Sequence, residues 1–118
     1  MKIVLMGPKG AGKSSVGRLL SESTGFPTVE TDIMVEDLHA GRGGDRLTCR
    51  EIYARHGEEY FRALERDVAA DAANLDWHLI ITGGSMMLDP IARRSLRADA
   101  LLVYLIGEPD VLWARAIR

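Results

Sequence analysis

The segment that most constrains the fold of this chain is Gly7–Ser14, with the sequence G-P-K-G-A-G-K-S. It matches the spacing G-x-x-x-x-G-K-[S/T], and it lies between an apolar run over residues 3–6 and a segment of helical character over residues 15–20. In that context the glycines let successive backbone N–H groups converge on phosphate oxygens, and the positive end of the following helix points to the same place. The segment therefore predicts a phosphate-binding loop in a chain that binds a nucleoside triphosphate.

The loop also assigns tasks to individual residues. Lys13 is expected to reach the terminal phosphates, and the Ser14 hydroxyl is expected to ligate Mg²⁺. The residues expected to hold the nucleotide are Gly10, Ala11, Gly12, Lys13, Ser14 and Ser15. A glycine-rich turn that matches by chance is the alternative, and the flanking strand and helix argue against it.

Composition narrows the range of partners. A net charge of −2 gives neither nucleic acid nor an anionic membrane an electrostatic footprint to bind, and no apolar run is long enough to cross a bilayer. The lone cysteine, Cys49, cannot form an internal disulfide, which fits a reducing cytoplasm, and we expect it to be an ordinary helix residue. The length of 118 residues predicts one domain, 1–118, which we take to be a cytoplasmic monomer.

Apolar runs, separated by glycines and prolines, predict alternating strands and helices. The predicted strands are 2–6, 28–30, 78–82 and 100–106, and the predicted helices are 13–24, 32–40, 49–55, 58–74, 89–97 and 109–118. The last two strands are continuously apolar rather than alternating, which is typical of strands covered by helices on both faces. The expected fold is therefore α/β, a three-layer parallel sheet flanked by helices.

The end of the chain differs from the rest. The predicted helix 109–118 begins but shows no terminal glycine or other stop signal, and the strand before it would keep an unpaired edge. We therefore expect the chain to be the front part of a longer protein, with a C-terminally incomplete domain.

Two carboxylates, Glu30 and Asp32, lie at the end of the second predicted strand. Ligands of open parallel sheets bind outside the carboxyl ends of the strands, so both side chains should face the crevice that holds the phosphate loop. Glu30 could hold Mg²⁺ through its water shell, and Asp32 could accept the proton of a substrate hydroxyl. Asp32 could equally cap the helix that follows it.

Two further clusters carry candidate binding groups. Arg62 could grip a substrate carboxylate with its two-pronged guanidinium, held by Glu65 one helical turn away. By composition alone, a solvated charged helix face is the favoured explanation of this cluster. Gly83 and Gly84 follow the third strand and would let backbone N–H groups approach a ligand closely, although a plain strand-to-helix turn is the alternative.

Taken together, these segments resemble the shikimate kinases, in order and over the whole chain. The resemblance is carried by the phosphate loop with its trailing Ser14-Ser15-Val16-Gly17-Arg18-Leu19, by Glu51-Ile52-Tyr53, by Gly57-Glu58-x-x-Phe61-Arg62-x-x-Glu65, by Gly83-Gly84, and by Val103-Tyr104-Leu105. The resemblance implies a P-loop kinase fold and a phosphotransferase that uses ATP and Mg²⁺. The implied reaction transfers the γ-phosphate of ATP to the 3-hydroxyl of shikimate, in aromatic amino acid biosynthesis.

The resemblance also implies residue roles. Lys13 would neutralise charge on the transferring phosphoryl group, and Asp32 would bind ring hydroxyls and help deprotonate the 3-hydroxyl. Arg62 would bind the shikimate carboxylate, and the backbone N–H groups of Gly83 and Gly84 would complete the acceptor pocket. Tyr53 and Phe61 would form the wall of that pocket.

Several positions depart from the family pattern. Glu30 stands where the family usually has aspartate, Ser85 stands at the third position of a usual glycine triplet, and the loop 41–47 is a few residues longer. The family's lid would begin beyond Arg118, so we expect a chain that binds ligands but turns over poorly. Two alternatives stay open at this point: a kinase for another polyol such as gluconate, and a catalytically silent nucleotide-binding module.

Overall fold

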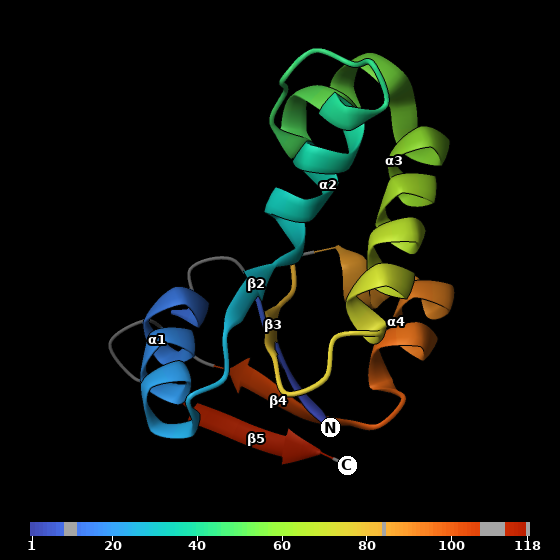
Figure 1. The fold of residues 1–118 in the computed structure, drawn as a ribbon. Coiled ribbons are helices and arrows are strands. Elements are labelled where there is room, and N and C mark those ends of the chain that lie inside the picture. Colours follow the sequence, from blue (N-terminus) through green and yellow to red (C-terminus); the bar gives the residue numbers. More distant parts are fainter. Residues whose placement is uncertain (9–11, 84, 107–112, 118) are drawn as a thin grey trace.

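The computed structural model describes residues 1–8, 12–83, 85–106 and 113–117 (Figure 1). The strands are β1 (Lys2–Met6), β2 (Thr28–Glu30), β3 (Leu79–Ile81), β4 (Ala100–Ile106) and β5 (Trp113–Ile117). The helices are α1 (Lys13–Thr24), α2 (Thr31–Gly41), α3 (Cys49–Ala73), the short 3₁₀ helix η1 (Met86–Leu88) and α4 (Pro90–Arg97). Up to β4, these elements agree with the predicted ones to within about a residue at most ends, except that η1 was not predicted.

The sheet has the strand order β2-β3-β1-β4-β5, and its first four strands are parallel. Helix α1 covers one face, while α3 and α4 cover the other (Figure 1). In β1, Val4 belongs to the core beneath α3 and α4, whereas Ile3 and Leu5 belong to the core beneath α1. Burial on both faces explains why these strands are continuously apolar, and it confirms the predicted three-layer α/β architecture.

Helices α2 and α3 pack against each other and extend together away from the sheet (Figure 1). Helix α3 begins with a capping box, in which Thr48 and Glu51 each accept a hydrogen bond from the other's backbone N–H. It is interrupted at Gly57, whose φ of 89° lies in the left-handed region that favours glycine. The two separate helices predicted over 49–55 and 58–74 thus correspond to the two halves of a kinked α3.

The helix predicted over 109–118 is wrong for the part of it that the structure describes. Residues 113–117 form β5, which pairs antiparallel with β4 from Leu102↔Ile117 to Ile106↔Trp113. Residues 109–112 and 118 lie outside the described residues. The free edge of β4 offers a row of unpaired backbone N–H and C=O groups with which another segment can pair. The pairing of 113–117 with this edge overrides the local preference of that segment for a helix. The edge of β4 that was expected to stay unpaired is therefore covered.

Asp89 connects α4 to the long helix α3. Its carboxylate accepts from Arg66 Nε at 2.8 Å and Arg66 Nη2 at 3.1 Å, and it caps α4 by accepting from the Ile91 N–H at 3.4 Å. The Asp89 residue is buried, and it sits between η1 and Pro90, the first residue of α4. This junction therefore fixes α4 beside the chain segment that leaves β3.

We expect Asp89→Ala to lower the free energy of unfolding at neutral pH by about 2 kcal/mol, because it removes a helix cap and a charge-assisted hydrogen-bonded pair. Arg66 holds the pKa of Asp89 below its usual value. The contribution of the Asp89 carboxylate to the free energy of unfolding is therefore fully present at pH values above the ordinary pKa of a carboxyl group. It fades as the pH falls through the lowered native value. Urea unfolding at pH 7 and at about pH 3 measures the difference. Asp71→Ala, an exposed substitution on α3, is the control. An equal loss for Asp89→Ala at both pH values would contradict the assignment.

Candidate functional site

Three chain segments converge where β1, β2 and β3 end. The phosphate loop follows β1, α2 begins directly after β2, and Thr82 and Gly83 follow β3. Because these strands are parallel neighbours, their carboxyl ends lie at one edge of the sheet. The residues predicted from three separate stretches of sequence therefore belong to one region of the fold.

The described part of the phosphate loop shows a pre-folded helix start. Gly12 has φ 86° and ψ 26°, and its carbonyl accepts from the Val16 N–H at 3.0 Å, so α1 begins directly after it. The Lys13 ammonium donates to the Gly7 carbonyl at 2.7 Å, across the base of the loop. Gly10 and Ala11, two of the six predicted nucleotide-binding residues, lie outside the described residues, whereas Gly12, Lys13, Ser14 and Ser15 lie at the start of α1.

Burial lowers the pKa of Lys13, and the negative charge of Asp32 opposes that effect. The ammonium and the carboxylate are therefore close enough to act on each other electrostatically. A cation partly removed from water is a stronger partner for a phosphate oxygen than a fully hydrated one. The structure thus places the two predicted catalytic groups, Lys13 and Asp32, in one electrostatic environment.

Asp32 lies against the backbone that follows β3. A Cβ added to Gly83 would overlap the Asp32 carboxylate, and the Gly83 N–H donates to the Thr31 hydroxyl at 2.8 Å. The cap position of α2 is held by Glu30, and Asp32 is the second residue of the helix, so the capping alternative does not describe its place. Gly83 is thus the residue that leaves room for Asp32. Gly84, the other predicted member of this turn, lies outside the described residues.

Arg62 is held in a network of hydrogen bonds beside this turn. Its Nη1 donates to Glu65 Oε1 at 2.7 Å and to the Ser85 carbonyl at 3.3 Å, and the Ser85 hydroxyl donates to Glu65 Oε2 at 2.9 Å. Glu65 is 2% exposed. This arrangement differs from a solvated charged helix face. The support of Arg62 by Glu65 matches the predicted geometry, whereas the part played by Ser85 was missed.

Helix α3 also carries the two aromatic rings predicted to form the pocket wall, and a thiol. Tyr53 and Phe61 meet edge to face with their ring centroids 5.7 Å apart, and Phe61 is buried. Cys49 is the first residue of α3, and its thiol contacts the Asp32 carbonyl oxygen at 3.4 Å. Burial, together with the charges of Asp32 and Glu36, raises the pKa of Cys49 to about 12, so the thiol is not a ready nucleophile.

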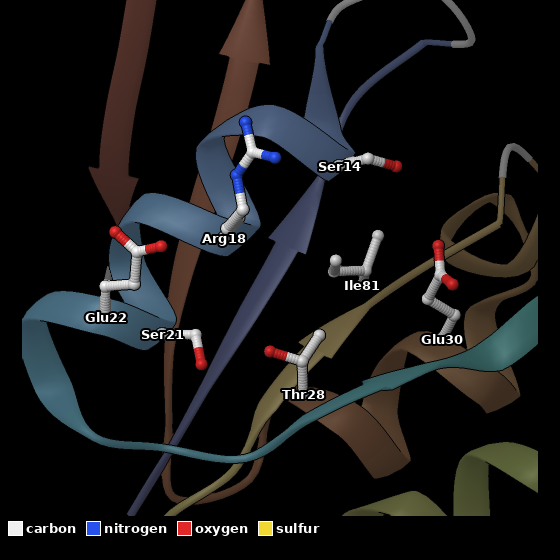
Figure 2. Close-up of a pocket in the computed structure, with 7 residues that line it drawn as sticks. All are labelled: Ser14, Arg18, Ser21, Glu22, Thr28, Glu30 and Ile81. Atoms are coloured by element: carbon white, nitrogen blue, oxygen red, sulfur yellow. The ribbon is translucent and has the colours of Figure 1, made fainter.

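A hollow of about 300 Å³ lies between α1 and the sheet (Figure 2). Ser14 on α1 and Glu30 on β2 both line it, and Figure 2 shows their oxygen atoms toward the same end, away from Glu22. Hydroxyl and carboxylate oxygens are the donors that Mg²⁺ takes, usually together with several waters and phosphate oxygens. The residues present therefore fit the predicted metal. Among the residues that the structure describes, no three histidine, cysteine, aspartate or glutamate side chains gather at one point.

A second, larger cavity of about 510 Å³ adjoins the phosphate loop on the α4 side. Its lining is largely apolar and includes Gly7, Gly83 and Tyr104, with Arg93 and Arg97 from α4. The two arginines were not among the predicted site residues, although their spacing of four places them on one helix face. Within the described parts of the chain, no helix is both long and apolar enough to cross a membrane.

Comparisons with known proteins agree with this geometry. The sequence model of the shikimate kinase family matches residues 9–118. A shikimate kinase of Symbiobacterium thermophilum is 45% identical over 98% of this chain and 63% of its own length. Among solved structures, the shikimate kinase of Aquifex aeolicus is 31% identical, with a TM-score of 0.76, over 93% of this chain and 62% of that one.

A second solved structure, the shikimate kinase of Acinetobacter baumannii in complex with shikimate, is 30% identical, with a TM-score of 0.76. The similarity covers 90% of this chain and 56% of that one. This chain thus spans between 56% and 63% of the length of these three relatives.

Proposed function

This chain belongs to the shikimate kinase family, and from that membership we propose that its site binds ATP with Mg²⁺ and transfers the γ-phosphate to the 3-hydroxyl of shikimate. The reaction serves aromatic amino acid biosynthesis in the cytoplasm. Residues 1–118 belong to one domain, which acts as a monomer on a small-molecule substrate. Neither nucleic acid nor membrane is a partner, in keeping with the net charge of −2.

The observation that supports the proposal is that Lys13, Asp32 and Gly83 follow the carboxyl ends of three parallel strands, and that Arg62 bonds to the Ser85 carbonyl two residues after Gly83. Shikimate presents a carboxylate and ring hydroxyls, which need a cationic fork and a carboxylate acceptor. Arg62 supplies the fork, and it is already oriented by Glu65 at 2.7 Å. Asp32 supplies the acceptor, beside the turn at Gly83.

The chemistry follows from these positions. The 3-hydroxyl oxygen of the acceptor attacks the γ-phosphorus of ATP, the bond from that phosphorus to the bridging oxygen of ADP breaks, and Asp32 receives the hydroxyl proton. Lys13 exchanges its contact with the Gly7 carbonyl for phosphate oxygens and offsets the developing negative charge. Arg62 holds the acceptor so that the attacking oxygen lies in line.

The metal would be held by Ser14 directly and by Glu30 through water. When bound, Mg²⁺ supplies charge neutralisation on the phosphates. The Glu30 side chain is longer by one methylene than the aspartate usual in the family, and a contact through water would tolerate that difference in length.

Mass spectrometry at stoichiometric protein concentration tests the proposal, because a single turnover per molecule is then detectable. The protein is incubated with MgATP and either shikimate or gluconate. We expect the mass of shikimate plus one phosphoryl group, no corresponding product from gluconate, and no product with Lys13→Met. Phosphorylated gluconate, or a shikimate product that persists in Lys13→Met, would overturn the proposed reaction.

A further inference from the structure

We propose that Ser85 is a positioning residue of the acceptor site, because it contacts both members of the Arg62–Glu65 pair and so fixes the guanidinium. The inference rests on the proposed function for the identity of the acceptor. The geometric part of the inference, that the Arg62–Glu65 pair depends on Ser85, does not require the acceptor to be shikimate. Ser85 occupies the third position of a turn that the family usually builds from glycines.

The backbone at Ser85 makes this arrangement possible without strain. Its φ of −105° and ψ of −15° are open to any residue, so no glycine is needed there. Ser85 precedes η1, yet its side chain makes no capping hydrogen bond to that helix. The hydroxyl is therefore free to donate to Glu65 Oε2 at 2.9 Å. A glycine at this position would offer no such donor.

The Ser85 carbonyl also contacts the Arg62–Glu65 pair. It accepts from the Leu88 N–H at 3.1 Å, which fixes it to η1, and from Arg62 Nη1 at 3.3 Å. One residue thus provides an acceptor for the arginine and a donor for the glutamate. Because Arg62 uses Nη1 to bond to Glu65 and to the Ser85 carbonyl, the other edge of its guanidinium, Nε and Nη2, can bind a carboxylate with two hydrogen bonds. Glu58 stands 3.9 Å from Nε and is a weak competitor for that edge.

The charge state of Glu65 links this geometry to acceptor binding. Burial raises the pKa of Glu65, the hydrogen bonds from Ser85 and Arg62 lower it, and the charge of Asp32 raises it. The charge of Glu65 also acts on Cys49, whose pKa of about 12 keeps that thiol neutral. An arriving substrate carboxylate adds a further negative charge beside Arg62. Without the Ser85 donor, Glu65 should take up a proton at that moment and release Arg62 from its orientation.

Three substitutions separate the hydroxyl from the backbone: Ser85→Ala and Ser85→Gly remove the donor, and Ser85→Thr keeps it. The first readout needs no ligand: the pH titration of the Glu65 carboxyl carbon, followed by NMR in the 118-residue protein. We expect the titration midpoint to move to higher pH in Ser85→Ala and Ser85→Gly, and to stay near the wild-type value in Ser85→Thr. Ser95→Ala, which removes a hydroxyl bonded to the Ile91 carbonyl, is the control and should leave it unchanged.

The second readout is calorimetry of shikimate binding with MgADP in two buffers of different ionisation heat, which counts the protons taken up. We expect Ser85→Ala to bind roughly tenfold more weakly than wild type near pH 7, with increased proton uptake, and Ser85→Thr to restore both values. An unchanged Glu65 titration in Ser85→Ala and Ser85→Gly overturns the inference. Failure of the wild type to bind shikimate overturns the proposed function instead, and the ligand-free titration then decides the role of Ser85.

Discussion

Gly83→Ala is expected to weaken acceptor binding by roughly 100-fold or more, a loss of about 3 kcal/mol. A Cβ at this position would occupy the space of the Asp32 carboxylate, so the carboxylate or the end of β3 must move. The Gly83 N–H, bonded to the Thr31 hydroxyl at 2.8 Å, ties the same turn to the start of α2, so the displacement cannot be confined to one side chain. Calorimetry of shikimate binding in the presence of MgADP measures the effect.

Gly41→Ala is the matched control for this substitution. Gly41 is the last residue of α2, and a Cβ there would meet nothing within 4 Å. Alanine favours the helical conformation over glycine, so the control should bind the acceptor normally and unfold at a similar or higher temperature. If Gly83→Ala bound shikimate as tightly as Gly41→Ala, Asp32 would not hold the position that its proposed role requires.

Arg62→Ala carries the second large effect. The guanidinium is the cation proposed to meet the acceptor carboxylate, and losing a charge-assisted pair in a desolvated site weakens binding by roughly 100- to 1000-fold. Nucleotide binding should stay within about twofold of wild type, because the phosphate loop lies on other segments. Calorimetric titrations with MgADP and with shikimate separate the two quantities.

Two comparisons refine the result for Arg62. Arg62→Lys keeps the positive charge but lacks the fork, so we expect it to recover only part of the shikimate affinity. Arg55→Ala, which removes an exposed arginine on the same helix, should change neither shikimate nor nucleotide binding. Full shikimate affinity in Arg62→Ala would show that the acceptor carboxylate, if there is one, is held elsewhere.

Much of the fold follows from local signals in the sequence. The four parallel strands and the break at Gly57 each depend on residues within one short window, and the structure confirms them. The conformation of the segment 113–117 does not follow from local signals, because it depends on pairing with the free edge of β4. A helical preference read within ten residues contains no information about a partner strand.

The candidate site also has features that the sequence predicts and features that it does not. That Asp32 and Gly83 lie in one region follows from the rule that parallel strands end together, although 51 positions separate them in the sequence. That Gly83 must be glycine because of Asp32 is a matter of packing, which no spacing rule contains. The bond from Ser85 to Glu65 likewise spans 20 residues, and a serine in a loop carries no sequence signal for such a partner.

The most direct test of the proposed acceptor site is a backbone amide NMR titration of the isotopically labelled protein with shikimate, in the presence of MgADP. Asp32, Gly83 and Ser85 should shift together and saturate with one dissociation constant. The amides around the separate polar pocket that His39 and His56 line should stay in place. Shifts confined to that pocket, or no saturable shifts in a protein shown to be folded, would contradict a shikimate site at the ends of β1, β2 and β3.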